Sequence, residues 1–231
     1  MSSMVDWLPS ADAVALIVSI VLWVGFEWVI EHSRWAPRTL TAAVNGQRKS
    51  WMRIAMDRDF RIVDATLFGN LMHSISFLAS ASLIILGVVG AALGAVGTDM
   101  ELVQQKIPFL RPETAAEIEA KLVLIGVIFI FSFLNFTWSL QQFNFCCILL
   151  GASPRETITD IEKETFANRV ARLANRGGRS FSRGLRGFYY ALASIAWFIH
   201  PVALVLAVGV VTLILGRREF FSVSRYEMID R

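Results

Sequence analysis

Residues 122–153 read LVLIGVIFIFSFLNFTWSLQQFNFCCILLGAS and contain no Asp, Glu, Lys or Arg. The hydrocarbon core of a bilayer is about 30 Å thick and needs about 20 apolar helical residues, so this stretch is longer than one crossing requires. Three other stretches have the same character: residues 13–30, which hold one acid, residues 65–98 and residues 187–216. The sequence therefore predicts an all-α, polytopic membrane helix bundle with about four transmembrane helices, near residues 13–30, 70–97, 122–148 and 189–216.

The composition of the chain agrees with this prediction. Of its 231 residues, 55% are apolar and 18% are charged, whereas soluble globular domains carry about 25% charged residues. An ordinary soluble domain is therefore excluded, and residues 1–231 are expected to form a single integral membrane domain. Before the third stretch, Thr114 and Glu117 have the spacing of a capping box. We expect a helix to begin there and to run straight on into the span.

The distribution of Lys and Arg predicts the orientation in the membrane. Residues 31–64 hold seven, residues 99–121 three, residues 154–186 eight and residues 217–231 four. Four spans place fifteen on one side and seven on the other, and the richer side is cytoplasmic. We therefore expect basic cytoplasmic loops at 31–64 and 154–186, both termini outside, and residence in the cell inner (plasma) membrane. If residues 187–216 reversed direction instead of crossing, the C-terminal tail would be cytoplasmic.

Both cytoplasmic loops are expected to form amphipathic helices at the membrane interface. In the second loop, six arginines recur every three or four residues and would form one stripe on an unbroken helix: Arg169, Arg172, Arg176, Arg179, Arg183 and Arg186. Gly177 and Gly178 are expected to break that helix. Since guanidinium groups bind phosphate and carboxylate in bidentate fashion, the stripe is a candidate docking site for anionic lipid headgroups, a phosphorylated ligand or an acidic protein partner.

Polar residues inside the spans gather in their predicted cytoplasmic halves, and the outer halves are almost entirely aliphatic. The candidates for a polar vestibule open to the cytoplasm are Glu27, Asn70, His73, Asn135, Ser139, Gln142 and His200. Because polar groups in lipid need partners, these side chains are expected to face the interior of the bundle. The alternative is that they form hydrogen bonds between helices and only hold the bundle together.

Three of these residues invite more specific hypotheses. An ionisable group inside a span suggests function, and Glu27 could instead reach the interface or be neutralised by Arg34, Arg38 or a loop arginine. His73 and His200 could ligate one haem b from two helices; hydrogen-bonded or interfacial histidines are the alternative. No cofactor and no other metal site is predicted.

Several activities lack their sequence signatures. The chain has no nucleotide-binding, hydrolase or zinc motif, which argues against an enzyme, and no aromatic readout module accompanies the basic residues, which argues against nucleic-acid binding. Gly90 and Gly94 form one GxxxG pair. Such a pair permits close helix approach, either within the chain or in a homo-oligomer.

Six local phrases resemble one family of membrane proteins. They are RKSWM at 48–52, RDFRIVD at 58–64, FLASASL at 77–83, FTWSLQQFN at 136–144, GASP at 151–154 and FSRGLR at 181–186. Together they resemble the "domain of unknown function 599" family of multi-pass membrane proteins. The resemblance implies a bacterial-type integral membrane protein of about this length, and it transfers no activity, cofactor or catalytic residue.

The sequence leaves three functions open. The first is a non-enzymatic interaction or assembly protein with an arginine-rich cytoplasmic face, whose partners would be anionic lipids or a protein of a membrane complex. The second is a small transporter or inward-facing binding protein built around the polar vestibule. The third is a haem b electron carrier.

Overall fold

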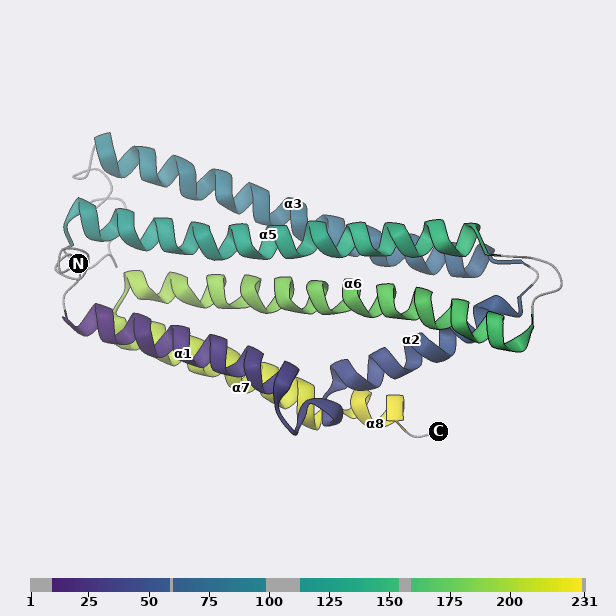
Figure 1. Ribbon diagram of the computed structural model, residues 1–231. Helices are drawn as coiled ribbons and strands as arrows, with labels where there is room; N and C mark the ends of the chain where they lie inside the picture. The colour runs from purple at the N-terminus through teal and green to yellow at the C-terminus, as the bar shows by residue number, and fades with distance from the viewer. Residues whose placement is uncertain (1–9, 59, 99–112, 154–158, 230–231) are drawn as a thin grey trace, which may run out of the picture.

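The computed structural model describes residues 10–58, 60–98, 113–153 and 159–229, and every element within them is helical. In chain order these are α1 (Ser10–His32), η1 (Ala36–Arg38), α2 (Leu40–Met56), α3 (Ile62–Thr98), α5 (Ala115–Gly151), α6 (Asp160–Ser194), η2 (Ile195–Phe198), α7 (Pro201–Phe221) and α8 (Val223–Ile229). Figure 1 shows α3, α5 and α6 running along an elongated bundle, with α1 and α7 paired along one half of it. The predicted all-α bundle is confirmed.

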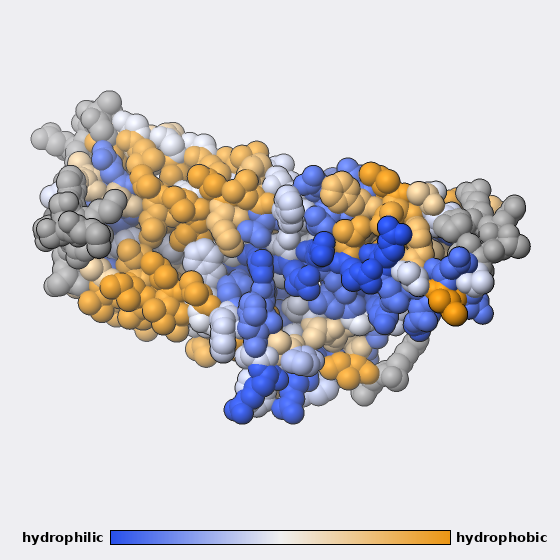
Figure 2. Space-filling view, in the orientation of Figure 1, coloured by the Kyte–Doolittle hydropathy of each residue, from blue (hydrophilic) through white to orange (hydrophobic). Residues whose placement is uncertain are grey.

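The surface of the bundle divides it into two halves. In Figure 2 apolar residues cover the half that contains α1 and α7, and polar residues gather on the half that contains α2. We call these the apolar half and the polar half. Four helical segments are long and apolar enough to cross a membrane: Ala11–His32, Ile62–Val96, Ala115–Gly151 and Pro201–Ile229. The 37 residues of α3 and of α5 span roughly 55 Å at 1.5 Å per residue, so both helices extend from the apolar half well into the polar half.

The predicted fourth span, residues 189–216, is not one helix. Its first residues are the end of α6, which began at Asp160, and its remainder is α7, which begins at Pro201 and runs back in the opposite direction (Figure 1). The reversal falls at His200, whose backbone is extended (φ −167°, ψ 146°). Proline disfavours a helical conformation in the residue before it and is well suited to the first turn of a new helix. The prediction of one helix over residues 189–216 is therefore wrong, and α8 lies on the polar half, away from the start of α1.

The capping box predicted before the third span is confirmed. The Thr114 side chain accepts a hydrogen bond from the Glu117 N–H, and the Glu117 carboxylate accepts one from the Thr114 N–H. From there α5 continues without a break to Gly151, as expected. A second capping box, Thr159 with Glu162, starts α6. Hydrogen bonds from the backbone N–H and hydroxyl of Thr159 hold the pKa of Glu162 below its usual value.

The core of the bundle lies between α5 and α6, where aromatic rings of one helix pack on glycines of the other. Phe143 contacts Gly177. Seven residues earlier in α5, Phe136 contacts Gly184, which lies seven residues later in the antiparallel helix α6. A Cβ atom at Gly184 would lie 2.8 Å from the ring of Phe136. The glycines therefore allow α6 to approach α5 closely, with both phenylalanine side chains fully buried.

Asp64 of α3 forms hydrogen bonds that join α2 to α3 at the far end of the polar half. It is fully buried, and one carboxylate oxygen accepts hydrogen bonds from Trp51 Nε1 at 2.7 Å and from Arg58 Nη1 at 2.8 Å. Arg61 donates to the Leu150 carbonyl at the end of α5. Two of the six family-like phrases, residues 48–52 and 58–64, thus fix how α2 and α3 join α5.

Candidate functional site

The arginine stripe lies on one continuous helix, because α6 runs from Asp160 to Ser194 through Gly177 and Gly178. The expected break is wrong. A glycine inside a helix costs about 1 kcal/mol relative to alanine, and here both glycines are buried against neighbouring helices. Gly177 contacts Phe143, and Gly178 accommodates the guanidinium of Arg48 from α2. Burial lowers the pKa of Arg48.

The stripe divides into three parts with different surroundings. Arg169, Arg172 and Arg176 are exposed and form no ion pair within the described ranges. We call these three residues the distal arginines. Arg179 is also exposed and lines a cavity, whereas the last two arginines, Arg183 and Arg186, pair with carboxylates of α1.

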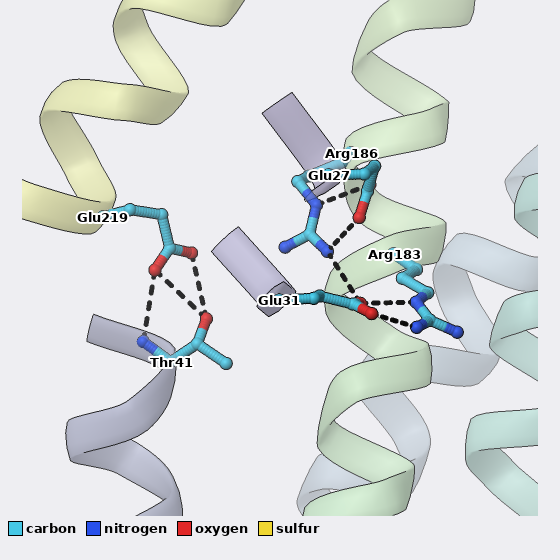
Figure 3. Close-up of polar contacts among 6 residues, drawn as sticks. All are labelled: Glu27, Glu31, Thr41, Arg183, Arg186 and Glu219. Atoms are coloured by element: carbon cyan, nitrogen blue, oxygen red, sulfur yellow. Dashed lines mark hydrogen bonds and ion pairs between the residues drawn. The ribbon is translucent and has the colours of Figure 1, made fainter. Parts of the chain in front are cut away.

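The α1–α6 ion pairs are bidentate (Figure 3). Arg186 donates through Nε and Nη2 to the two oxygens of Glu27, each at 2.7 Å, and its side chain is 6% exposed. Arg183 donates through the same two nitrogens to Glu31. Glu27 therefore has a partner in a loop arginine, one of the sources that the sequence allows. The pairs join α1 to α6 where the apolar half meets the polar half.

A cavity of about 410 Å³ lies beside these pairs, between the end of α1, η1, the start of α2 and the middle of α6. Its lining is mainly polar and comprises Ile30, Glu31, His32, Ala36, Thr39, Thr41, Ala42, Asn45, Arg179, Ser182, Arg183 and Arg186. Next to it, Glu219 of α7 accepts hydrogen bonds from the N–H (3.2 Å) and hydroxyl (3.1 Å) of Thr41. The first turn of α2 is thereby already occupied by a carboxylate. We call this space the junction cavity.

Two polar residues of the third span lie in the contact between α5 and α6. Ser139 donates to the Gly177 carbonyl of α6 at 2.8 Å. Gln142 is buried in the same contact, where its Oε1 atom accepts no hydrogen bond from the described residues. Asn135 is half-buried and donates to the Phe131 carbonyl of its own helix at 2.9 Å. Of these three residues, Ser139 alone forms a hydrogen bond between helices of the kind that holds a bundle together.

The remaining vestibule candidates do not join this group. Asn70 and His73 are exposed on α3. His200 is exposed at the reversal into α7, where its Nδ1 accepts a hydrogen bond from the Val202 N–H at 3.1 Å. The structure therefore brings Ser139 and Gln142 together, and it leaves Glu27 on α1, Asn70 and His73 on the exposed surface of α3, and His200 at the reversal into α7.

The two histidines are too far apart to ligate the same haem. His73 lies 25 residues before Thr98, about 38 Å along α3. His200 directly precedes α7, and α7 begins at the end of the bundle where α3 finishes (Figure 1). Among the described residues, no group of three or more His, Cys, Asp and Glu side chains is placed to hold a metal ion.

One ionic cluster was missed by the sequence analysis. At the far end of the apolar half, the Lys121 ammonium, whose side chain is 1% exposed, contacts Glu113 and lies 3.5 Å from Asp12. Asp12 accepts a hydrogen bond from Trp197 Nε1 at 2.6 Å. The available signal was the position of these residues, since Asp12 and Lys121 directly precede the first and third apolar stretches.

These features define the protein as an elongated helical bundle with four helices able to cross a membrane and an arginine-lined cavity at its centre. The chain belongs to the family described as "Protein of unknown function, DUF599", whose model matches residues 14–224. The resemblance seen in the six phrases is thereby confirmed. No curated protein and no solved structure matches the chain.

Proposed function

We propose that this is a multi-pass protein of the cell inner membrane, with its N-terminus outside and no enzymatic role, whose distal arginines dock an acidic cytoplasmic segment of a partner protein. The observation that carries the proposal is the state of Arg169, Arg172 and Arg176. All three are exposed on one face of α6 without an ion pair inside the described ranges. Three like charges in a row repel one another, so an acidic partner would relieve that repulsion.

The position of the distal arginines favours a protein partner over a lipid surface. Trp28 and Trp35 are exposed at the level of the α1–α6 ion pairs, and tryptophan is enriched at membrane interfaces. Placing the membrane surface there puts Arg176 roughly 10 Å and Arg169 roughly 21 Å beyond Arg183 along α6. The field of an anionic membrane decays within a Debye length of about 8 Å. Lipid headgroups would therefore attract the distal arginines only weakly.

The polar half has a second property of an interaction surface. Ile62, Val63 and Leu67 of α3 and Ile148 of α5 are exposed there, beyond the length of helix that a bilayer covers. Large contiguous patches of exposed apolar groups mark contacts with other proteins, and we infer that these residues contribute to such a contact. The transporter alternative has less support, because Asn70, His73 and His200 are exposed and do not join Ser139 and Gln142 in the interior.

Affinity purification from native membranes, with quantitative mass spectrometry of the proteins recovered, tests the proposal. We expect the double variant Arg172→Glu/Arg176→Glu to lose at least one protein that the wild type recovers. The control Arg217→Glu/Arg218→Glu changes the charge equally at two exposed residues of α7 and should retain it. Recovery of every partner at wild-type levels by the first variant, at equal expression, would refute docking by the distal arginines.

A further inference from the structure

We propose that the junction cavity binds a phosphate group, carried either by the headgroup of an anionic phospholipid or by a soluble phosphate ester. The cavity does not include the distal arginines, so this inference is independent of the proposed docking function. It rests on the charge of the lining, the hydrogen-bond donors left free in it and its position on the molecule.

One guanidinium group of the lining has no carboxylate partner among the described residues. The lining holds Arg179, Arg183, Arg186 and the carboxylate of Glu31. Arg183 pairs with Glu31, and Arg186 pairs with Glu27, which lies outside the lining. Arg179 forms no ion pair among the described residues, so its positive charge is left to attract an anionic ligand.

Donors remain available even on the arginines that are already paired. Arg183 and Arg186 each use Nε and Nη2 for their carboxylates, which leaves Nη1 of each group. In Figure 3 this third nitrogen of Arg186 points away from both carboxylates, toward the side where Thr41 lies. Ser182 and Asn45 also line the cavity. Neither the Ser182 hydroxyl nor the Asn45 amide nitrogen donates a hydrogen bond inside the described ranges, and the Asn45 Oδ1 atom accepts one from Arg48.

This set of donors fits phosphate better than carboxylate. A phosphate group presents three or four acceptor oxygens in a tetrahedral arrangement, so it can take donors from several directions at once. Here the donors come from two helices, with Arg179, Ser182, Arg183 and Arg186 on α6 and Asn45 on α2. The first turn of α2 contributes no anion site of its own, because Glu219 already occupies it. A volume of about 410 Å³ leaves room for the substituents of a phosphate ester.

The position of the cavity favours a phospholipid as the source of the phosphate. It lies at the end of α1, whose surface toward the apolar half exposes Val21 and Val24, on which an acyl chain could lie. Arg34 and Arg38 stack on the Trp35 ring, at 5.6 Å and 5.2 Å. Tryptophan and arginine side chains of this kind are typical of the headgroup level of a membrane.

Binding to the purified, delipidated full-length protein in neutral detergent tests the inference. The probes are dioctanoyl-phosphatidylglycerol, sodium phosphate, and dioctanoylglycerol, which lacks the phosphate. We expect the phospholipid to bind, and Arg179→Gln to weaken that binding about tenfold or more, as loss of a charge-assisted hydrogen bond would. Arg176→Gln removes the same charge one turn away, outside the cavity, and should leave the affinity unchanged.

Each outcome decides a separate point. Phospholipid binding that sodium phosphate does not displace identifies a lipid site, and efficient displacement by sodium phosphate identifies a site for soluble phosphate esters. Equal binding of dioctanoylglycerol, no binding of either phosphate probe, or binding unaffected by Arg179→Gln would overturn the inference. Because Arg172→Glu/Arg176→Glu should keep phosphate binding, failure of the docking proposal would be recognised separately.

Discussion

Lys121 is the residue on which the far end of the apolar half depends. Its ammonium is almost fully buried, contacts Glu113, lies 3.5 Å from Asp12 and sits 5.2 Å from the centre of the Trp197 ring. It therefore holds the starts of α1 and α5 and the short helix η2 at one point. A buried charge is tolerated only when its partners compensate for lost hydration.

We expect Lys121→Met to destabilise the protein by about 3–5 kcal/mol, the usual cost of breaking a buried ion pair by removing one partner. Methionine nearly keeps the volume of the side chain, so the loss reflects the contacts of the ammonium with Glu113 and Asp12. Denaturant unfolding in detergent measures the change. Glu119→Gln, on the same turn of α5 and in no ion pair among the described residues, should change stability by less than about 0.5 kcal/mol. Similar effects of the two substitutions would contradict the role assigned to Lys121.

Glu27 and the polar residues of the third span show how much of the candidate site could be predicted from the sequence. The cost of an acid inside an apolar stretch left two alternatives for Glu27, namely reaching the interface or pairing with an arginine. Which arginine pairs with it did not follow, because Arg186 is 159 residues away and meets Glu27 only when α6 packs on α1. Asn135, Ser139 and Gln142 were expected to face the bundle interior, and Ser139 and Gln142 are buried there while Asn135 is half-buried. The sequence could not distinguish a hydrated vestibule from the contact with α6 that the structure contains.

Among the elements, α6 was the least predictable. Its first half is basic and its last residues are apolar, so a search for apolar stretches joined those last residues to α7. The His200-Pro201 pair marked the boundary, but a proline within an apolar run is equally consistent with a kink. Gly177 and Gly178 predicted a break in the helix. That prediction failed because their packing partners, Phe143 and Arg48, belong to other helices and cannot be identified from the local sequence.

The glycines of α6 lead to a prediction about helix packing. We expect Gly184→Ala to destabilise the protein by about 1–3 kcal/mol, the usual cost of overpacking a core. The new Cβ would lie 2.8 Å from the Phe136 ring and 3.1 Å from the Ser132 carbonyl, and backbone cannot easily move away. Thermal unfolding in detergent, followed by circular dichroism, measures the effect.

Gly209→Ala in α7 is the matched control, since a Cβ there meets nothing within 4 Å. It should be neutral or slightly stabilising, because alanine favours a helix by about 1 kcal/mol over glycine. The same open space surrounds Gly87 and Gly90 of α3. Packing within the chain therefore does not explain why glycine, and not a larger residue, occupies those two positions. If Gly184→Ala were as stable as Gly209→Ala, close approach of α6 to α5 would not depend on this position.

For the whole molecule, the reversal at His200 changes the balance of charge. With α7 running back along the bundle, the end of α7 and α8 lie on the same side as the two basic loops. Counting the four basic residues of 217–231 on that side changes the count from fifteen against seven to nineteen against three. The positive-inside rule is obeyed more strongly by this arrangement than by four simple crossings. The sequence held this alternative open, and charge alone did not select it.

Labelling of single cysteines in intact cells with a membrane-impermeant maleimide tests this arrangement. In a background in which Cys146 and Cys147 are replaced by alanine, we expect Ile199→Cys to react from outside, since Ile199 is exposed at the reversal between η2 and α7. Ser224→Cys and Ile161→Cys, both exposed on the polar half, should react only after the cells are opened. Ile161 lies in a basic segment whose side of the membrane does not depend on the reversal, so it serves as the internal standard.

Reaction of Ser224→Cys from outside, with Ile161→Cys protected, would mean that the chain crosses the membrane once between residues 187 and 216. The C-terminal segment would then lie opposite the junction cavity, and Glu219 could not reach Thr41.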